Sequence, residues 1–304
     1  MTNDNFNILV LDGGGSKGLY TLGILSELEK YLKTQLCEHF NLIYGTSTGS
    51  IIAALIATGK SVDDITSLYM DLVPQVMSKT LPSSKSKHLK KEGDKIFDGF
   101  DFSNLQTDIG IVSLNNKTKE PIIFKSNKEQ AHGMKSSFVP GFGQTITDAV
   151  LSSSAAYPIF KKVNLTLNSG EEVELVDGGF VANNASLYAL VDALKAFKIK
   201  KDKIKLLSIG TGVFVDKSTG VIQNTINWIP ATKFFTQIFS ASTNTNAKLK
   251  DLIYPDISSV RINDTFTELK TNMIEKNEAK LKTMFHLGTK SYAKHESEIK
   301  KLYS

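Results

Sequence analysis

The chain has 304 residues, of which 41% are hydrophobic and 22% are charged. A chain of this length and composition buries enough surface to fold as one large domain, which excludes disorder for its body. Apolar runs stay well below the roughly 18 consecutive residues that a membrane-spanning helix needs.

The formal net charge of +5 comes almost entirely from lysine, because Arg261 is the only arginine. Recognition of bases favours the guanidinium fork of arginine, whereas lysines suit a solvated surface or an attraction to anionic lipid headgroups. We therefore expect no DNA or RNA partner. Cys37 is the only cysteine, and residues 1–5 lack the features of a secretory signal, so we expect a cytoplasmic protein without disulfides.

The first elements alternate between strand and helix. Residues 6–11 form an apolar run of strand length, and leucines recur at helical spacing over residues 19–32. Residues 40–44 predict a second strand, and the nearly all-apolar residues 50–58 predict a buried helix. A capping box that begins at Ser61 predicts an amphipathic helix through Val73.

The next segment, residues 74–102, is rich in Ser, Lys and Gly and shows little periodicity, which predicts a lid or a mobile insertion. A helix is expected at 185–197 and a lysine-rich helical tail at the end of the chain. Further strands are predicted at residues 109–114, 121–124, 162–167, 171–176, 204–209 and 259–262.

Strands separated by helices predict an α/β fold with a mostly parallel central sheet flanked by helices. We expect a single domain over residues 1–304, with a motif-bearing core at about 6–212. The part over residues 213–304 is less clearly defined and is expected to be mainly helical.

The first motif is Gly13-Gly14-Gly15-Ser16-Lys17-Gly18, between a strand and a helix. A dinucleotide site needs an acidic residue after the second strand, and glycine, serine and threonine stand there instead. A phosphate loop of the Walker type also fails, because Lys17 is followed by Gly18. What the motif offers is a run of backbone N–H groups at a helix N-terminus, where negative charge is stabilised.

The second motif is Gly45-x-Ser47-x-Gly49, between a strand and the apolar helix. Small residues two before and two after a serine allow a sharp turn that lifts the hydroxyl out of the sheet. The position between a strand and a buried helix favours Ser47 as a nucleophile.

The third motif is Asp177-Gly178-Gly179 at a strand end. A serine nucleophile needs a group that takes its proton. His286 and His295 would complete a Ser-Asp-His triad, but both lie in the lysine-rich tail without a glycine turn. A dyad of Ser47 and Asp177 is the simpler hypothesis.

These three motifs, together with the segments Ser152 to Phe160 and Leu207 to Gly212, resemble the patatin-like phospholipase family in order and spacing. The resemblance implies phospholipase A-type hydrolysis of acyl esters through an acyl-enzyme. It implies Ser47 as the nucleophile and Asp177 as the other member of the dyad. The implied supporting residues are the oxyanion glycines Gly13, Gly14 and Gly15, the basic Lys17, and Gly18, Gly45, Gly49, Gly178 and Gly179.

The resemblance also implies a membrane phospholipid substrate, and no metal or cofactor is expected. Some bacterial members of the family act in anti-phage defence and are gated by a cyclic oligonucleotide, so such an activator is a further hypothesis. Two alternatives stay open: a non-lipid carboxylesterase with a Ser-His-Asp triad, and a catalytically silent lipid-binding protein.

A lipid hydrolase without a spanning segment must dock on the membrane surface, here the inner face. The predicted docking residues are Lys85, Lys87, Lys90, Lys91, Phe138 and Phe142.

Overall fold

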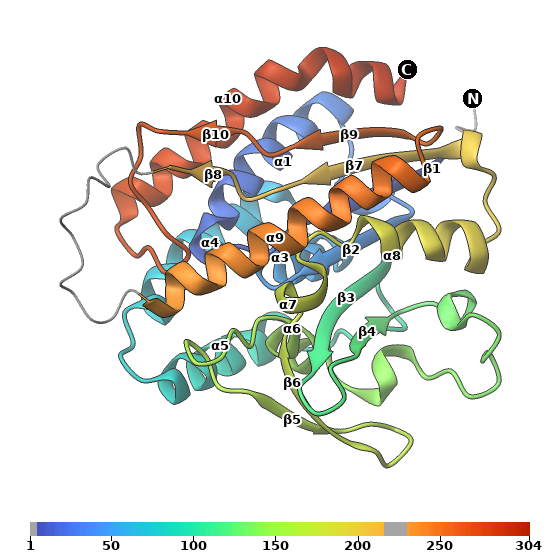
Figure 1. Cartoon of the computed structure of the whole chain (residues 1–304), viewed down its shortest axis with the longest axis horizontal. Coiled ribbons are helices and arrows are strands. Elements are labelled where there is room, and N and C mark those ends of the chain that lie inside the picture. Colours follow the sequence, from blue (N-terminus) through green and yellow to red (C-terminus); the bar gives the residue numbers. More distant parts are fainter. Residues whose placement is uncertain (1–4, 216–229) are drawn as a thin grey trace.

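The computed structural model describes residues 5–215 and 230–304, except for the side chains of residues 230–233. Its core is an eight-stranded sheet with helices on both faces (Figure 1). The strands of this sheet are β1 (Phe6–Leu11), β2 (Leu42–Thr46), β3 (Asp108–Asn115), β4 (Pro121–Lys125), β5 (Val163–Thr166), β6 (Glu172–Asp177), β7 (Ile204–Ile209) and β9 (Ser258–Ile262).

The strand order is β5-β6-β3-β2-β1-β7-β9, and β4 also pairs with β3. The pairs of β1 with β2, β1 with β7, β2 with β3 and β7 with β9 are parallel, whereas β4 and β6 run antiparallel to β3 and β5 runs antiparallel to β6. The predicted mostly parallel sheet is confirmed. Because β1, β2 and β7 are parallel, the loops that follow them leave the same edge of the sheet, where α/β folds bind ligands.

Two short strands, β8 (Val213–Phe214) and β10 (Thr265–Phe266), form a separate parallel pair. The helices are α1 (Gly18–Leu32), α2 (Leu36–His39), α3 (Thr48–Ala57), α4 (Val62–Met77), α5 (Pro82–Ile96), α6 (Ile146–Ser153), α7 (Gly179–Ala182), α8 (Ser186–Val191), α9 (Pro230–Ile253) and α10 (Glu278–Tyr303).

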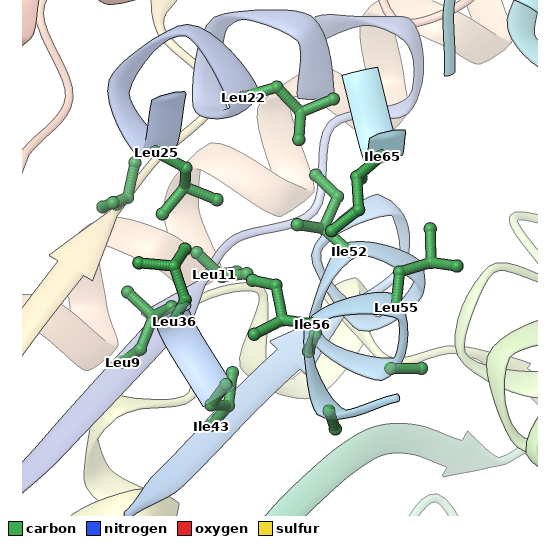
Figure 2. Packing of buried hydrophobic residues seen from close by; sticks show 14 of the residues in the cluster. Leu9, Leu11, Leu22, Leu25, Leu36, Ile43, Ile52, Leu55, Ile56 and Ile65 are labelled. Atoms are coloured by element: carbon green, nitrogen blue, oxygen red, sulfur yellow. The ribbon is translucent and has the colours of Figure 1, made fainter. Parts of the chain in front are cut away.

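The alternation of side chains along β1 divides the core between the two faces of the sheet. Leu9 and Leu11 point to the face covered by α1, α3, α4 and α10. Figure 2 shows their packing with residues of α1, α3 and α4. Ile8 and Val10 point to the opposite face and pack with α8. Each of these four side chains is fully buried.

The last helix, α10, belongs to the core. A Cβ atom on Gly23 of α1 would lie 2.0 Å from the backbone oxygen of Phe285. The backbones of α1 and α10 are therefore in direct contact at this point, with no room for a side chain between them. Leu281, Met284 and Leu287 are buried in this contact. The carboxyl-terminal part of the chain therefore supports the glycine motif that begins α1.

The prediction of an irregular segment over residues 74–102 is wrong. Helix α4 continues to Met77, and α5 follows after a short turn, with Pro82 in its first turn, where a missing N–H costs nothing. Only a narrow stripe of α5 is buried, which includes Leu89 and Gly93. Because most residues of this helix are polar, its sequence lacks a recognisable helical spacing of apolar residues.

Helix α9 lies in the part, residues 213–304, for which the sequence predicts mainly helix without defined bounds. The low helix propensity of its Asn- and Thr-rich sequence leaves those bounds undefined. Its apolar side chains Phe235 and Phe239 are buried against Phe180. The Asn- and Thr-rich stretch with Trp228 that precedes it lies outside the described residues.

Candidate active site

Ser47 occupies a sharp turn between β2 and α3. Its backbone angles are φ 53° and ψ −123°, a conformation that non-glycine residues adopt only where the surroundings impose it. The flanking glycines permit the turn: a Cβ atom on Gly49 would lie 2.2 Å from the backbone oxygen of Leu11, and one on Gly45 would lie 2.4 Å from that of Gly49. The turn predicted from the spacing of the glycines is present.

The Ser47 hydroxyl donates to Asp177 Oδ2 over 2.7 Å. Asp177 ends β6 and is fully buried, and its Oδ1 accepts from the backbone N–H of Gly179 over 2.7 Å. Burial raises the pKa of the Asp177 carboxyl to about 7, and its two hydrogen bonds oppose this rise only in part. An aspartate with a pKa near 7 can take a proton from a serine and return it at physiological pH.

Ser153 fixes the nucleophile turn from the side. Its Oγ accepts from the backbone N–H of Ser47 over 2.8 Å and donates to the backbone oxygen of Val112 over 2.5 Å. The backbone oxygen of Ser153 accepts from the N–H of Gly178, and that of Ala155 accepts from the N–H of Asp177. The end of α6 and the residues directly after it therefore set the distance between the serine and the aspartate.

The glycine loop Gly13–Gly15 lies beside this turn. A Cβ atom on Gly13 would lie 2.9 Å from Ser47 Cβ, and Thr48 Oγ1 donates to the backbone oxygen of Gly15 over 2.9 Å. Within residues 5–215 and 230–304, no hydrogen bond uses the N–H of Gly13, Gly14 or Gly15. The loop thus holds three uncommitted backbone donors next to the serine.

Both ends of the glycine loop are fixed by the carboxyl-terminal part of the chain. Arg261 of β9 forms an ion pair with Asp12, which precedes the loop, and Asn184 Nδ2 also donates to Asp12 over 2.9 Å. After the loop, the N–H of Ser16 donates to the backbone oxygen of Met273 over 2.9 Å. The sequence reasoning missed these contacts, since nothing in the pattern after Val213 connects it to residues 12–16.

Lys17 follows the loop, and in the described part of the chain its ammonium contacts neither Ser47 nor Asp177. Its Nζ donates to the backbone oxygen of Gly212 over 3.4 Å. Burial lowers the pKa of its ammonium to about 8, against the attraction of Asp12. Gly18 begins α1, Gly178 is the N-cap residue of α7 and Gly179 is its first residue, so all residues of the three motifs meet at one edge of the sheet.

An apolar cavity with about 640 Å³ of empty space opens at Ser47 and Asp177. Its walls come from α3, α4 and α5 and from the segment 156–160. Among its lining residues are Ile51, Leu72, Val76, Leu89, Ile159 and Phe160. Ser154, which also lines it, is buried and has an Oγ without a hydrogen-bond partner in the described part of the chain.

None of the five histidines lines this cavity. His286 is exposed on α10, and His295 pairs with Asp264 and Glu298. The structure thus brings Ser47 to Asp177 and leaves both tail histidines elsewhere. In the described ranges, no three His, Cys, Asp or Glu side chains are grouped to hold a metal ion, and no helix is long and apolar enough to cross a bilayer.

The predicted docking residues do not form one exposed patch. Lys85 is buried, and its ammonium donates to the backbone oxygen of Lys79. Phe142 packs edge-on against Phe124, with ring centroids 5.8 Å apart. Lys87, Lys90 and Lys91 are exposed, and Lys90 forms ion pairs with Asp94 and Asp148. Phe138 is half-buried.

The family model "Patatin-like phospholipase" matches residues 9–190. The chain belongs to the patatin-like phospholipase family, as the motifs suggested, and is a hydrolase of that type. It is 39% identical over 301 residues to the cUMP-AMP-activated phospholipase of Escherichia coli, a match that covers 98% of this chain and 94% of the relative.

Two further relatives match with lower identity. The cGAMP-activated phospholipase of Escherichia coli strain TW11681 is 28% identical over 228 residues, which cover 67% of this chain and 61% of the relative. Patatin-like protein 2 of Arabidopsis thaliana is 28% identical over 249 residues, covering 67% and 59%.

Proposed function

We propose that this chain hydrolyses acyl esters of membrane phospholipids with a dyad of Ser47 and Asp177, and that a cyclic dinucleotide activates it. The observation that carries the proposal is the 2.7 Å hydrogen bond from Ser47 Oγ to a buried carboxylate, at the mouth of an apolar cavity. A nucleophile, a base and a place for an acyl chain are thus adjacent.

In the first half of the reaction, Ser47 Oγ attacks the ester carbonyl and its proton passes to Asp177. The carbonyl oxygen becomes an oxyanion, which the free amides of Gly13, Gly14 and Gly15 receive. Loss of one such donor typically costs about 10²- to 10³-fold in turnover. The tetrahedral intermediate collapses, the lysophospholipid leaves with the proton from Asp177, and the acyl group stays on Ser47.

In the second half, a water molecule attacks the acyl-enzyme and gives its proton to Asp177. Collapse of the second intermediate returns that proton to Ser47 Oγ and releases the fatty acid. Asp177 thus acts as base and then acid in each half, which a pKa of about 7 suits. The apolar side chains of α3, α4 and α5 hold the acyl chain away from water.

Two similarities support activation by a cyclic dinucleotide. The relative that matches along nearly the whole chain is named as activated by cUMP-AMP, and a second relative is named as activated by cGAMP. Within this proposal, residues 1–304 form a single domain that acts at the inner face of the cytoplasmic membrane.

The test is mass spectrometry of the lipid products from phosphatidylglycerol and phosphatidylethanolamine vesicles, with and without cUMP-AMP and cGAMP. We expect free fatty acid and lysophospholipid from the wild type, increased by one of the nucleotides, and neither product from Ser47→Ala. Absence of fatty acid release under all these conditions would refute the lipid hydrolase. Release that no nucleotide changes would refute the activation alone.

A further inference from the structure

A second cavity, with about 580 Å³ of empty space, lies behind the glycine loop. It is enclosed by this loop, the segment 211–213, α9 and Met273. Its walls carry more polar surface than those of the apolar cavity at Ser47, although apolar surface still predominates. Among the side chains that line it are those of Lys17, Asn183, Thr211, Thr243, Asn244 and Asn263.

The charges around this cavity leave one cation available. Lys17 lines it, and its ammonium has only the backbone oxygen of Gly212, at 3.4 Å, as a partner among the described residues. Asp12 also lines it, but its carboxylate is taken by Arg261 and Asn184. An ammonium has three donors, so Lys17 keeps donor capacity for one anionic group.

The neutral side chains also leave hydrogen-bonding capacity. Asn183 is 4% exposed, and its Nδ2 donates to Thr243 Oγ1 over 2.8 Å, whereas its Oδ1 has no partner in the described ranges. Asn244 also lines the cavity and is exposed, so its amide offers both a donor and an acceptor to a ligand. The edge of a nucleobase or a ribose hydroxyl can pair with such an amide.

This cavity shares its walls with the candidate active site. Phe239 and Met273 line both cavities. The backbone oxygen of Gly13 accepts from Asn183 Nδ2 and from Thr211 Oγ1, each over 3.3 Å. A ligand in the second cavity therefore contacts the side chains that hold the glycine loop.

We infer that the second cavity binds the activating cyclic dinucleotide, with a phosphodiester on Lys17 and a base edge on the asparagines. This inference rests on the proposed function and gives its activator a place. Occupation of the cavity fixes the Gly13 carbonyl and so the orientation of the oxyanion amides. The ligand thereby raises turnover without a contact to Ser47.

The sharpest variant is Asn244→Asp, which keeps the shape of the side chain and adds a negative charge to the cavity wall. Asn244 lies on α9 outside the catalytic machinery. The matched control is Thr245→Asp on the next residue, which is also exposed but does not line the cavity. Affinity for cUMP-AMP and cGAMP is measured by titration calorimetry, and turnover is measured on a short soluble ester without nucleotide.

We expect Asn244→Asp to weaken binding of the activating nucleotide at least tenfold, Thr245→Asp to leave it within twofold, and both to keep basal ester turnover. Equal affinity in the wild type and Asn244→Asp, or no binding of either nucleotide to the wild type, would overturn the site. Unchanged nucleotide affinity with a raised KM for phospholipid vesicles would also overturn it, because the cavity would then take the phosphodiester of the lipid.

Failure of the proposed hydrolysis is distinguishable from failure of this site. Nucleotide binding that Asn244→Asp weakens, in a protein that releases no fatty acid, supports the cavity and refutes the lipid hydrolase.

Discussion

Arg261 donates from Nη1 to Asp12 Oδ1 over 2.9 Å, and its Nη2 contacts Asp12 Oδ2, so the pair is bidentate. Asp12 is 2% exposed and directly precedes Gly13. A bidentate pair fixes the orientation as well as the position of a carboxylate. The only arginine of the chain thus connects β9 to the start of the loop that carries the proposed oxyanion donors.

Arg261→Lys is expected to lower kcat on a short soluble ester by roughly tenfold or more with little change in KM. An ammonium cannot reproduce the two parallel bonds, and a small displacement of catalytic donors is costly. As a control, Lys294→Gln removes an exposed ion pair with Asp264 and should leave kcat unchanged. Wild-type kcat in Arg261→Lys would show that the pair does not position the loop.

The pH dependence of the reaction should report Asp177. Asp177 must be deprotonated to accept the proton of Ser47, and its pKa is raised to about 7. We therefore expect kcat/KM to rise with pH through about 7 and to level off above it. Initial rates on a soluble ester between pH 5 and 9 give this profile; a rate already at its maximum at pH 5 would contradict the assignment.

The same shift has a consequence for stability. Between about pH 4 and 7 the folded state keeps a proton on Asp177 that the unfolded state has lost, so Asp177 makes folding less favourable as pH rises. A shift from 3.8 to about 7 corresponds to at most about 4 kcal/mol.

Asp177→Asn should therefore be inactive, yet its free energy of unfolding relative to the wild type should increase from pH 4 to pH 8. Urea denaturation of both proteins at the two pH values measures this difference. A difference that is the same at both pH values would show that the carboxyl is not held protonated by burial.

Ser154 offers a buried hydroxyl to the cavity that contains the dyad. Because this Oγ has no partner among the described residues, Ser154→Ala should not lower the free energy of unfolding. The same substitution should reduce kcat about fivefold, which is the effect of losing one ordinary hydrogen bond to a reacting group. Ser152→Ala is the control, since its Oγ bonds to the backbone oxygen of Asp148. Unchanged kcat in Ser154→Ala would leave the hydroxyl without a catalytic role.

The sequence identified the parts of the site that depend on local backbone geometry. A serine between two glycines at a strand end marks a sharp turn by its spacing alone, and the glycines before Ser16 mark a loop without side chains. The sheet could be predicted as mostly parallel because its apolar strands are short and separated by helices.

The missing parts depend on contacts over long separations. Asp12 and Arg261 are 249 residues apart, and Ser16 meets Met273 over a similar span, so no periodicity connects them. On α5, Lys85 is buried together with Leu89, and a pattern of apolar residues cannot reveal such an inward lysine.

The central claim is that Ser47 is an activated nucleophile, and covalent labelling tests it most directly. The wild type is treated with a fluorophosphonate, which phosphonylates activated serines, and the modified peptide is mapped by mass spectrometry. The account predicts one adduct, on Ser47, that is absent in Ser47→Ala and strongly reduced in Asp177→Asn. An adduct on another residue, or ester hydrolysis that persists in Ser47→Ala, would contradict it.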